Sequence, residues 1–217
     1  TCAPYQSRSR PRLGQQIAWA ESNAIVFANS VLGARTNRYG DFMDLCAALT
    51  GRAPSCGLHL TENRLGQVLF ELQDFPAGRA GRDIWFAALG LFAGEQVGAR
   101  IPVFAGLPPD TSEDELKALG AACASTGAVG LFHAVGITPE APTLAEAFGG
   151  RPVPQTLAVS RAQLQRTRAA LSQARPGDRL AAVSVGTPHF SLAEFEQLLS
   201  LLAEEEAGPR VDFYVNT

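Results

Sequence analysis

The chain has 217 residues, of which 46% are hydrophobic, and its formal net charge at pH 7 is −3. This length permits one large domain or two small ones, and the apolar content is ample for a core. The basic run Arg8 to Arg12 is short and interrupted by proline, and the net charge is negative, which argues against a nucleic-acid-binding surface. The sequence shows no long uncharged apolar stretch and no signal peptide, so we expect a cytoplasmic protein without a membrane span.

The first predicted element is an amphipathic helix that begins near Ile17 and leads into a polar loop. Apolar residues recur at helical spacing as far as Val31, and Gly33 suits the end of a helix. The polar residues outside this apolar stripe are Glu21, Ser22, Asn29, Ser30, Arg35, Thr36, Asn37 and Arg38. Burying such groups is costly unless they bind one another or a polar ligand. Two interpretations are open. These residues form either a solvated helix face with a polar loop or the lining of a ligand pocket.

Strand-like apolar runs then alternate with amphipathic helices. We expect strands over 67–72, 101–105, 129–137, 156–159, 180–185 and 211–215, and helices over 83–97, 112–125, 144–148, 161–174 and 192–206. Apolar strands joined by helical crossovers predict a layered α/β/α fold with a mostly parallel sheet. In particular, 129–135 and 181–185 are expected to be parallel strands of one sheet. Capping boxes are expected where Ser112 precedes Glu115 and where Ser191 precedes Glu194.

Two of the three histidines lie near the ends of expected strands, where ligands bind in open α/β sheets. They are His133 and His189. The turn Gly186-Thr-Pro-His-Phe-Ser191 also leads into a helix N-terminus, whose free N–H groups attract anions. Structural hydrogen bonding is the alternative role for each histidine, and helix capping is the alternative for the hydroxyls of Thr187 and Ser191.

The four cysteines show no zinc-like CxxC spacing. They are Cys2, Cys46, Cys56 and Cys123. Cys46 lies on a helical stripe with Phe42, Leu45 and Leu49, so we expect it to be a core thiol.

Several long motifs resemble the catalytic domain of aconitase X. These motifs are Thr1-Cys-Ala-Pro-Tyr5, Trp19 to Arg38, Asp44 to Arg52, Gly57 to Arg64, Leu131 to Glu140 and Gly186 to Ser191. They are spread over essentially the whole chain. The resemblance implies that residues 1–217 are part of one catalytic domain. The N-terminal part, the C-terminal part and a mobile swivel domain would then lie outside this chain.

Aconitase X enzymes are dehydratases that use an iron–sulfur cluster, held by cysteines, as a Lewis acid on the leaving hydroxyl. By resemblance, Cys2 is a cluster ligand and Cys123 is a candidate second ligand, with packing in a helix as its alternative. The turn over 186–191 carries Thr187 at the position where another branch of the family has a cysteine ligand. We expect a 2Fe–2S cluster in preference to a 3Fe–4S or 4Fe–4S cluster.

The resemblance therefore implies a hydro-lyase that removes water from cis-3-hydroxy-L-proline. His189, Ser191 and His133 are the expected catalytic residues. The expected substrate-binding residues are Glu21, Ser22, Asn29, Ser30, Arg35, Thr36, Asn37, Arg38 and Thr187. The expected partners are the small hydroxy acid and the swivel domain, in the same or a partner chain, and no nucleic acid or membrane.

Three alternatives stay open. The first is the large subunit of a mevalonate 5-phosphate dehydratase, which is disfavoured because a phosphate needs several cations. The only lysine in the chain, Lys117, is expected to face solvent on a helix. The second is a cofactor-free thiol enzyme that uses Cys2 beside His189. The third is a folded piece that has no activity in isolation.

Overall fold

The computed structural model describes residues 3–76, 78, 81–204 and 211–216. The helices are α1 (Ser22–Ser30), α2 (Met43–Thr50), α3 (Asp83–Val97), α4 (Glu113–Thr126), α5 (Leu144–Ala147), α6 (Arg161–Ala170) and α7 (Leu192–Glu204). The strands are β1 (Val68–Leu72), β2 (Pro102–Ala105), β3 (His133–Ala134), β4 (Thr156–Val159), β5 (Ala182–Val185) and β6 (Asp212–Val215). None of the helices in the described part of the chain combines the length and the low charge that crossing a bilayer requires.

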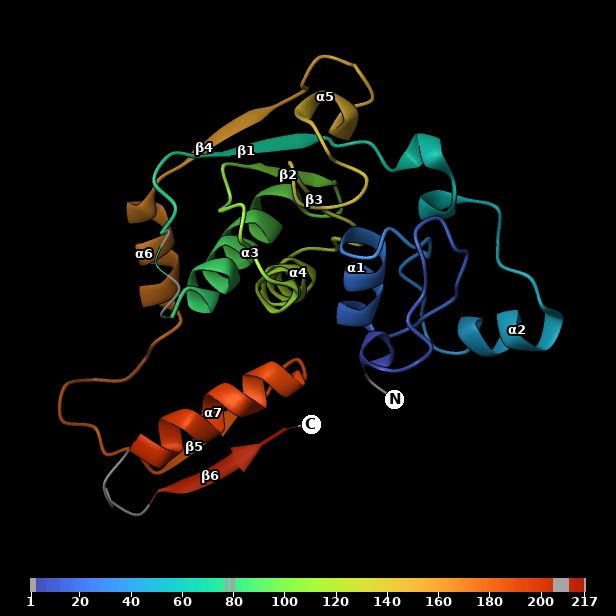
Figure 1. Cartoon of the computed structure of the whole chain (residues 1–217). Helices are drawn as coiled ribbons and strands as arrows, with labels where there is room; N and C mark the ends of the chain where they lie inside the picture. The colour runs from blue at the N-terminus through green and yellow to red at the C-terminus, as the bar shows by residue number, and fades with distance from the viewer. Residues whose placement is uncertain (1–2, 77, 79–80, 205–210, 217) are drawn as a thin grey trace.

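Four strands form one parallel sheet in the order β3-β2-β1-β4. Figure 1 shows α3, α4 and α6 on one face of this sheet and α5 on the other. The main core lies on the α3 and α4 side, where Phe70 and Phe104 stack with ring centroids 5.4 Å apart. A smaller cluster that includes Leu69 and Phe148 lies on the α5 side. The expected layered α/β fold with a mostly parallel sheet is confirmed.

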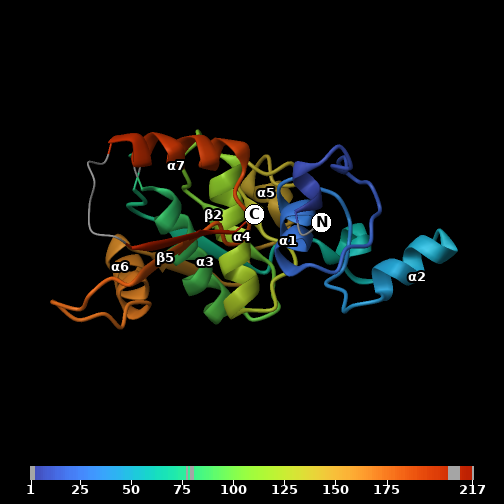
Figure 2. The same cartoon turned by 90° about the horizontal axis from the view of Figure 1, so that it is seen from below.

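The expectation that 129–135 and 181–185 pair in one sheet is wrong. β5 pairs with β6 in a separate two-stranded parallel sheet, which Figure 2 shows with α7 beside it. The physical reason lies at the free edge of β3. Helix α1 takes the backbone groups there, because the Phe132 amide donates to Ser30 Oγ at 2.9 Å and Asn29 Nδ2 donates to the Gly130 carbonyl at 2.8 Å. No place is left for a further strand at these residues.

Helix α1 begins five residues later than its apolar spacing predicts. Ile17 instead lies in an extended segment, whose amide donates to the Arg35 carbonyl at 3.0 Å. Glu21 is the N-cap of the helix, and its carboxylate accepts hydrogen bonds from the amides of Asn23 and Ala24 at 3.0 and 2.6 Å. All residues from Asn23 to Ser30 are buried, so the solvated helix face is wrong for this stretch.

The helix α2 projects from the body of the molecule, as Figures 1 and 2 show. It has no buried residue, and Cys46 is exposed. The expected core position of Cys46 is therefore wrong, because its stripe neighbours Leu45 and Leu49 are 56% and 87% exposed. Both expected capping boxes are present, at the starts of α4 and α7.

Candidate active site

A cleft of about 730 Å³ lies between the start of α1, the outer faces of α3 and α4, and the turn after β5. Its polar lining residues are Glu21, Ser22, Asn23, Arg38, Ser125, Thr187 and His189. Small and apolar residues of α3 and α4, such as Leu91 and Ala121, form the wall between them. The structure thus brings together five of the predicted site residues from the two ends of the sequence.

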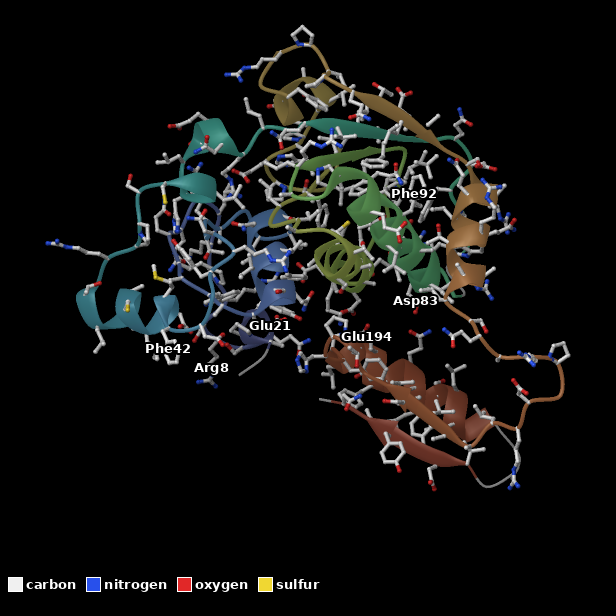
Figure 3. All side chains as sticks on the ribbon, turned by 180° about the vertical axis from the view of Figure 1, so that it is seen from behind. Arg8, Glu21, Phe42, Asp83, Phe92 and Glu194 are labelled. Carbon is white, nitrogen blue, oxygen red and sulfur yellow. The ribbon has the colours of Figure 1, made fainter. Side chains whose placement is uncertain are left out.

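The sequence predicts a site at the ends of the sheet strands, whereas the cleft lies at a different place. Its walls come from the helices and from two loops, and no residue of the four-stranded sheet lines it. Figure 3 shows Glu21 at the start of α1 and Glu194 in the first turn of α7; the cleft is lined by Ser22 and Asn23 of α1 and by the turn that leads into α7. The site lies over the helical layer because α1 and the turn before α7 both pack against α4.

Arg38 is the residue in the cleft best suited to bind an anion. One guanidinium nitrogen donates to the carbonyls of Ala124 and Gly127 at 3.3 and 3.2 Å, at the end of α4, and the other donates to Ser22 Oγ at 3.3 Å. The side chain is exposed, and it forms no ion pair within the described part of the chain. The guanidinium is therefore held in place with its charge available to a carboxylate, which Arg binds well.

Asn29, Ser30 and Thr36 lie outside the cleft and are buried. Asn29 Oδ1 accepts hydrogen bonds from the Thr36 amide at 3.0 Å and from Arg64 at 3.1 Å, and Asn29 Nδ2 donates to the Thr36 carbonyl at 2.9 Å. Ser30 Oγ bonds the Phe132 amide. The hydrogen-bonding groups of these three residues are used within the fold. Their role is therefore structural rather than the predicted contact with substrate.

Arg35 and Asn37 fasten a neighbouring loop. Arg35 donates to Thr61 Oγ1 at 2.7 Å and lies 3.9 Å from the Glu140 carboxylate. Asn37 Oδ1 accepts from the Leu58 amide at 2.6 Å. Neither residue lines the cleft, so Arg38 alone of this loop contributes a cation there.

His133 is buried against the backbone, away from the cleft. Its Nε2 donates to the Arg64 carbonyl at 2.7 Å, and burial lowers the pKa of the imidazole. Nδ1 has no hydrogen-bond partner among the described residues. A neutral, buried histidine that bonds a carbonyl fits the structural alternative better than the predicted catalytic role.

The turn after β5 places Thr187 and His189 in the cleft and Ser191 at the start of α7. Ser191 Oγ donates to Asp114 Oδ2 at 2.7 Å and accepts from the Glu194 amide at 3.2 Å. Both hydrogen-bonding roles of this hydroxyl are therefore used within the fold, as the capping alternative predicts.

Lys117 does not face solvent as its sequence spacing suggests, because its side chain is only 4% exposed. Two carboxylates explain the burial. The ammonium lies 3.0 Å from Asp114 Oδ1 and also pairs with Glu194. An ammonium can lie in the interior when carboxylates neutralise it and its donors are used.

The described cysteines form no disulfide with one another. Cys46 and Cys56 are exposed, whereas Cys123 is fully buried in the main core, where burial raises its pKa to about 12. Cys123 does not line the cleft, which fits its packing alternative. Cys2 lies outside the described residues, as does any contact between Cys2 and His189. No group of three or more His, Cys, Asp or Glu side chains in the described ranges is placed to hold a metal, so these residues alone do not form an iron–sulfur site.

We expect the replacements Cys123→Ser and Cys46→Ser to differ in effect. Cys123→Ser puts an unpaired hydroxyl into the core and should lower the free energy of unfolding by about 1–3 kcal/mol. Cys46→Ser changes an exposed side chain and should alter it by less than about 0.5 kcal/mol. Denaturant unfolding measures both changes in the free energy of unfolding.

Peptide mapping after alkylation should find Cys46 modified in the native protein and Cys123 modified only after unfolding. Modification of Cys123 in the native protein would contradict its burial.

The sequence-based prediction of the site did not include Asn23. Its side chain is buried, and Nδ2 donates to Tyr5 Oη at 2.7 Å, whereas Oδ1 has no partner in the described part of the chain. Asn23 follows Ser22 directly, so its place in the same motif was the available signal. The alanine-rich run from Ala118 to Ala124 was a second signal, because small side chains leave room beside a helix.

Comparisons with known proteins agree with these motifs. Residues 1–62 match the model for the first domain of aconitase X, and residues 66–169 match the model for its second domain. The chain is 46% identical to a cis-3-hydroxy-L-proline dehydratase of Pseudomonas aeruginosa, over 100% of this chain and 37% of that protein. It is 37% identical to the phosphomevalonate dehydratase large subunit of Thermococcus kodakarensis, over 93% of this chain and 49% of that protein.

A crystal structure of Thermococcus kodakaraensis aconitase X in its holo form has the same fold, with a TM-score of 0.86 at 34% identity. The match covers 98% of this chain and 52% of that chain. The chain thus spans between about a third and about a half of the length of these relatives. Motifs, domain models and fold agree, and the chain belongs to the aconitase X family.

Proposed function

We propose that the chain is part of a hydro-lyase that removes water from a small hydroxy acid, and that this acid is cis-3-hydroxy-L-proline. The observation that carries the proposal is the cleft that Arg38 lines together with Thr187 and His189. The Pseudomonas aeruginosa relative, named for this activity, supports the choice of substrate.

The charge of the cleft favours an amino acid over a phosphate ester. Arg38 is the single Arg or Lys among the residues that line the cleft in the described chain. One guanidinium suits one carboxylate, whereas a phosphate dianion calls for several cations. Lys117 does not add to the positive charge, because Asp114 and Glu194 neutralise it. Mevalonate 5-phosphate is therefore the less favoured substrate, although Lys117 is buried rather than exposed.

The cleft residues have separate roles in this proposal. Arg38 binds the substrate carboxylate and is itself held by Ser22 and by the end of α4. Thr187 and His189 line the same cleft, where the imidazole can donate a proton to the departing hydroxyl. Glu21 fixes the start of α1 through its two amide hydrogen bonds. We assign removal of the α-proton to the swivel domain, in the same chain or in a partner subunit.

For the cofactor, we propose a cluster of the 2Fe–2S type with Cys2 as one ligand. No three described His, Cys, Asp or Glu side chains form such a site, so at least part of the ligand set would lie outside the described residues. In the full-length parent protein, Cys2→Ser should lower the iron content measured by elemental analysis, because a hydroxyl does not replace a thiolate on iron. Cys46→Ser is the matched control and should leave iron unchanged. Normal iron in the Cys2 variant would refute the assignment.

The substrate proposal is tested by assaying the full-length parent enzyme with cis-3-hydroxy-L-proline and with mevalonate 5-phosphate at equal concentration. We expect turnover of the amino acid. Turnover of the phosphate ester alone would overturn the substrate while leaving the hydro-lyase class intact, and turnover of neither would overturn the proposed function.

A further inference from the structure

The ammonium of Lys117 joins helix α4 to the turn that carries His189. Its Nζ donates to Asp114 Oδ1 at 3.0 Å and to the His189 carbonyl at 2.9 Å, and it also donates to the Glu194 carboxylate. An ammonium has three N–H donors, and these three acceptors use them all. Two of the acceptors are more than 70 residues away in the sequence.

Further hydrogen bonds close this group into a ring. Asp114 accepts from Ser191 Oγ at 2.7 Å, and Glu194 accepts from the Ser191 amide at 2.7 Å. Lys117 therefore lies between two carboxylates, one from α4 and one from α7, that would face each other without it. We call Lys117, Asp114, Ser191 and Glu194 the latch.

The latch is the main polar contact between the C-terminal segment and the rest of the described chain. Every side-chain hydrogen bond that the structure describes between 180–216 and the earlier residues involves His189, Ser191 or Glu194. One of these comes from Gln6, which donates to the His189 carbonyl at 3.4 Å. The same turn forms one wall of the cleft. The geometry of this wall therefore depends on the latch.

We propose that Lys117 is a positioning residue of the active site. It holds the turn of Thr187 and His189 against α4, so that this turn lines the same cleft as Arg38. Its side chain acts through the His189 carbonyl and through Glu194, and it does not line the cleft itself. Without the ammonium, Asp114 and Glu194 repel each other, and the start of α7 moves away from α4.

Hydrogen exchange tests the docking without any assay of activity. In the full-length parent protein, Lys117→Met should speed amide exchange in 186–195 and leave 83–97 unchanged. Lys117→Arg keeps the charge and should restore part of the protection. Arg10→Gln is the matched control, because it removes an exposed pair with Glu113 on the same helix. Unchanged exchange in 186–195 would overturn the proposal, and so would an equal increase in 83–97.

The kinetic test rests on the proposed function. With cis-3-hydroxy-L-proline, Lys117→Met should raise KM and lower kcat/KM by about tenfold, since small displacements of binding groups weaken catalysis strongly. A purely structural loss would lower kcat through a smaller active fraction and leave KM unchanged, which would overturn the positioning role. If the wild-type parent turns over neither candidate substrate, the proposed function fails, while the exchange experiment still decides the role of Lys117.

Discussion

Replacing Arg64 by Met should lower the free energy of unfolding of this chain by about 3–5 kcal/mol, because it breaks a buried ion pair. The Arg64 side chain is 3% exposed and pairs with Glu140. It also donates to the carbonyls of Asn29, Ala34 and Leu58 at 3.0, 3.1 and 2.9 Å. A methionine fills much of the volume but leaves the carboxylate and the three carbonyls without this donor. Denaturant unfolding followed by tryptophan fluorescence measures the loss.

The matched control is Arg10→Gln. Arg10 and Glu113 also form an ion pair, but their side chains are 41% and 55% exposed. Water solvates both partners once they separate, so the loss should stay below about 1 kcal/mol. Similar small losses in the two variants would contradict the view that the Arg64 contacts hold the fold together.

On the proposed function, replacing Arg38 by Gln should raise KM of the parent enzyme for cis-3-hydroxy-L-proline by about 100-fold, the equivalent of one strong hydrogen-bonded charge contact. Removal of the α-proton shifts further negative charge onto the carboxylate, so the transition state loses more of this interaction than the substrate does, and kcat should fall as well. Because Arg38 is exposed, the stability of the protein should change little. Steady-state kinetics measures both constants.

Arg35→Gln is the control for this experiment, since Arg35 belongs to the same loop but bonds Thr61 and lies outside the cleft. An analogue of the substrate, in which an uncharged carboxamide replaces the carboxylate, provides a second test. The wild-type enzyme should discriminate strongly between the acid and its amide, whereas the Arg38 variant should discriminate weakly. Equal effects of the two arginine variants on KM would refute the assignment of the carboxylate to Arg38.

The local pattern of the sequence predicted the elements better than their partners. The strand at 156–159 is β4 as expected, and the capping boxes of Ser112 and Ser191 are present. Whether 181–185 joins β3 is decided by side chains of α1, which take up the free edge of that strand. An apolar run indicates that a segment is a strand, but it does not indicate which other strand this segment will pair with.

The same limit applies to the site. Arg35 and Arg38 are three residues apart and look alike in the sequence, but only Arg35 lies near Glu140, more than 100 residues away. Lys117 has the spacing of a solvent-facing residue, and its burial depends on Glu194, 77 residues further on. Long-range contacts of this kind decide which polar groups are neutralised within the fold and which remain for a ligand.

Arg64 also bears on how the two family modules depend on each other. The first-domain model ends at residue 62 and the second begins at 66, so Arg64 lies in the gap between them. Its guanidinium nevertheless binds Asn29, Ala34 and Leu58 on one side and Glu140 on the other. The boundary between the two domain models therefore falls at Arg64, whose side chain is hydrogen-bonded to residues of both. Neither module keeps all of its internal partners when it is cut from the other, and the pair is best regarded as one cooperative melting unit.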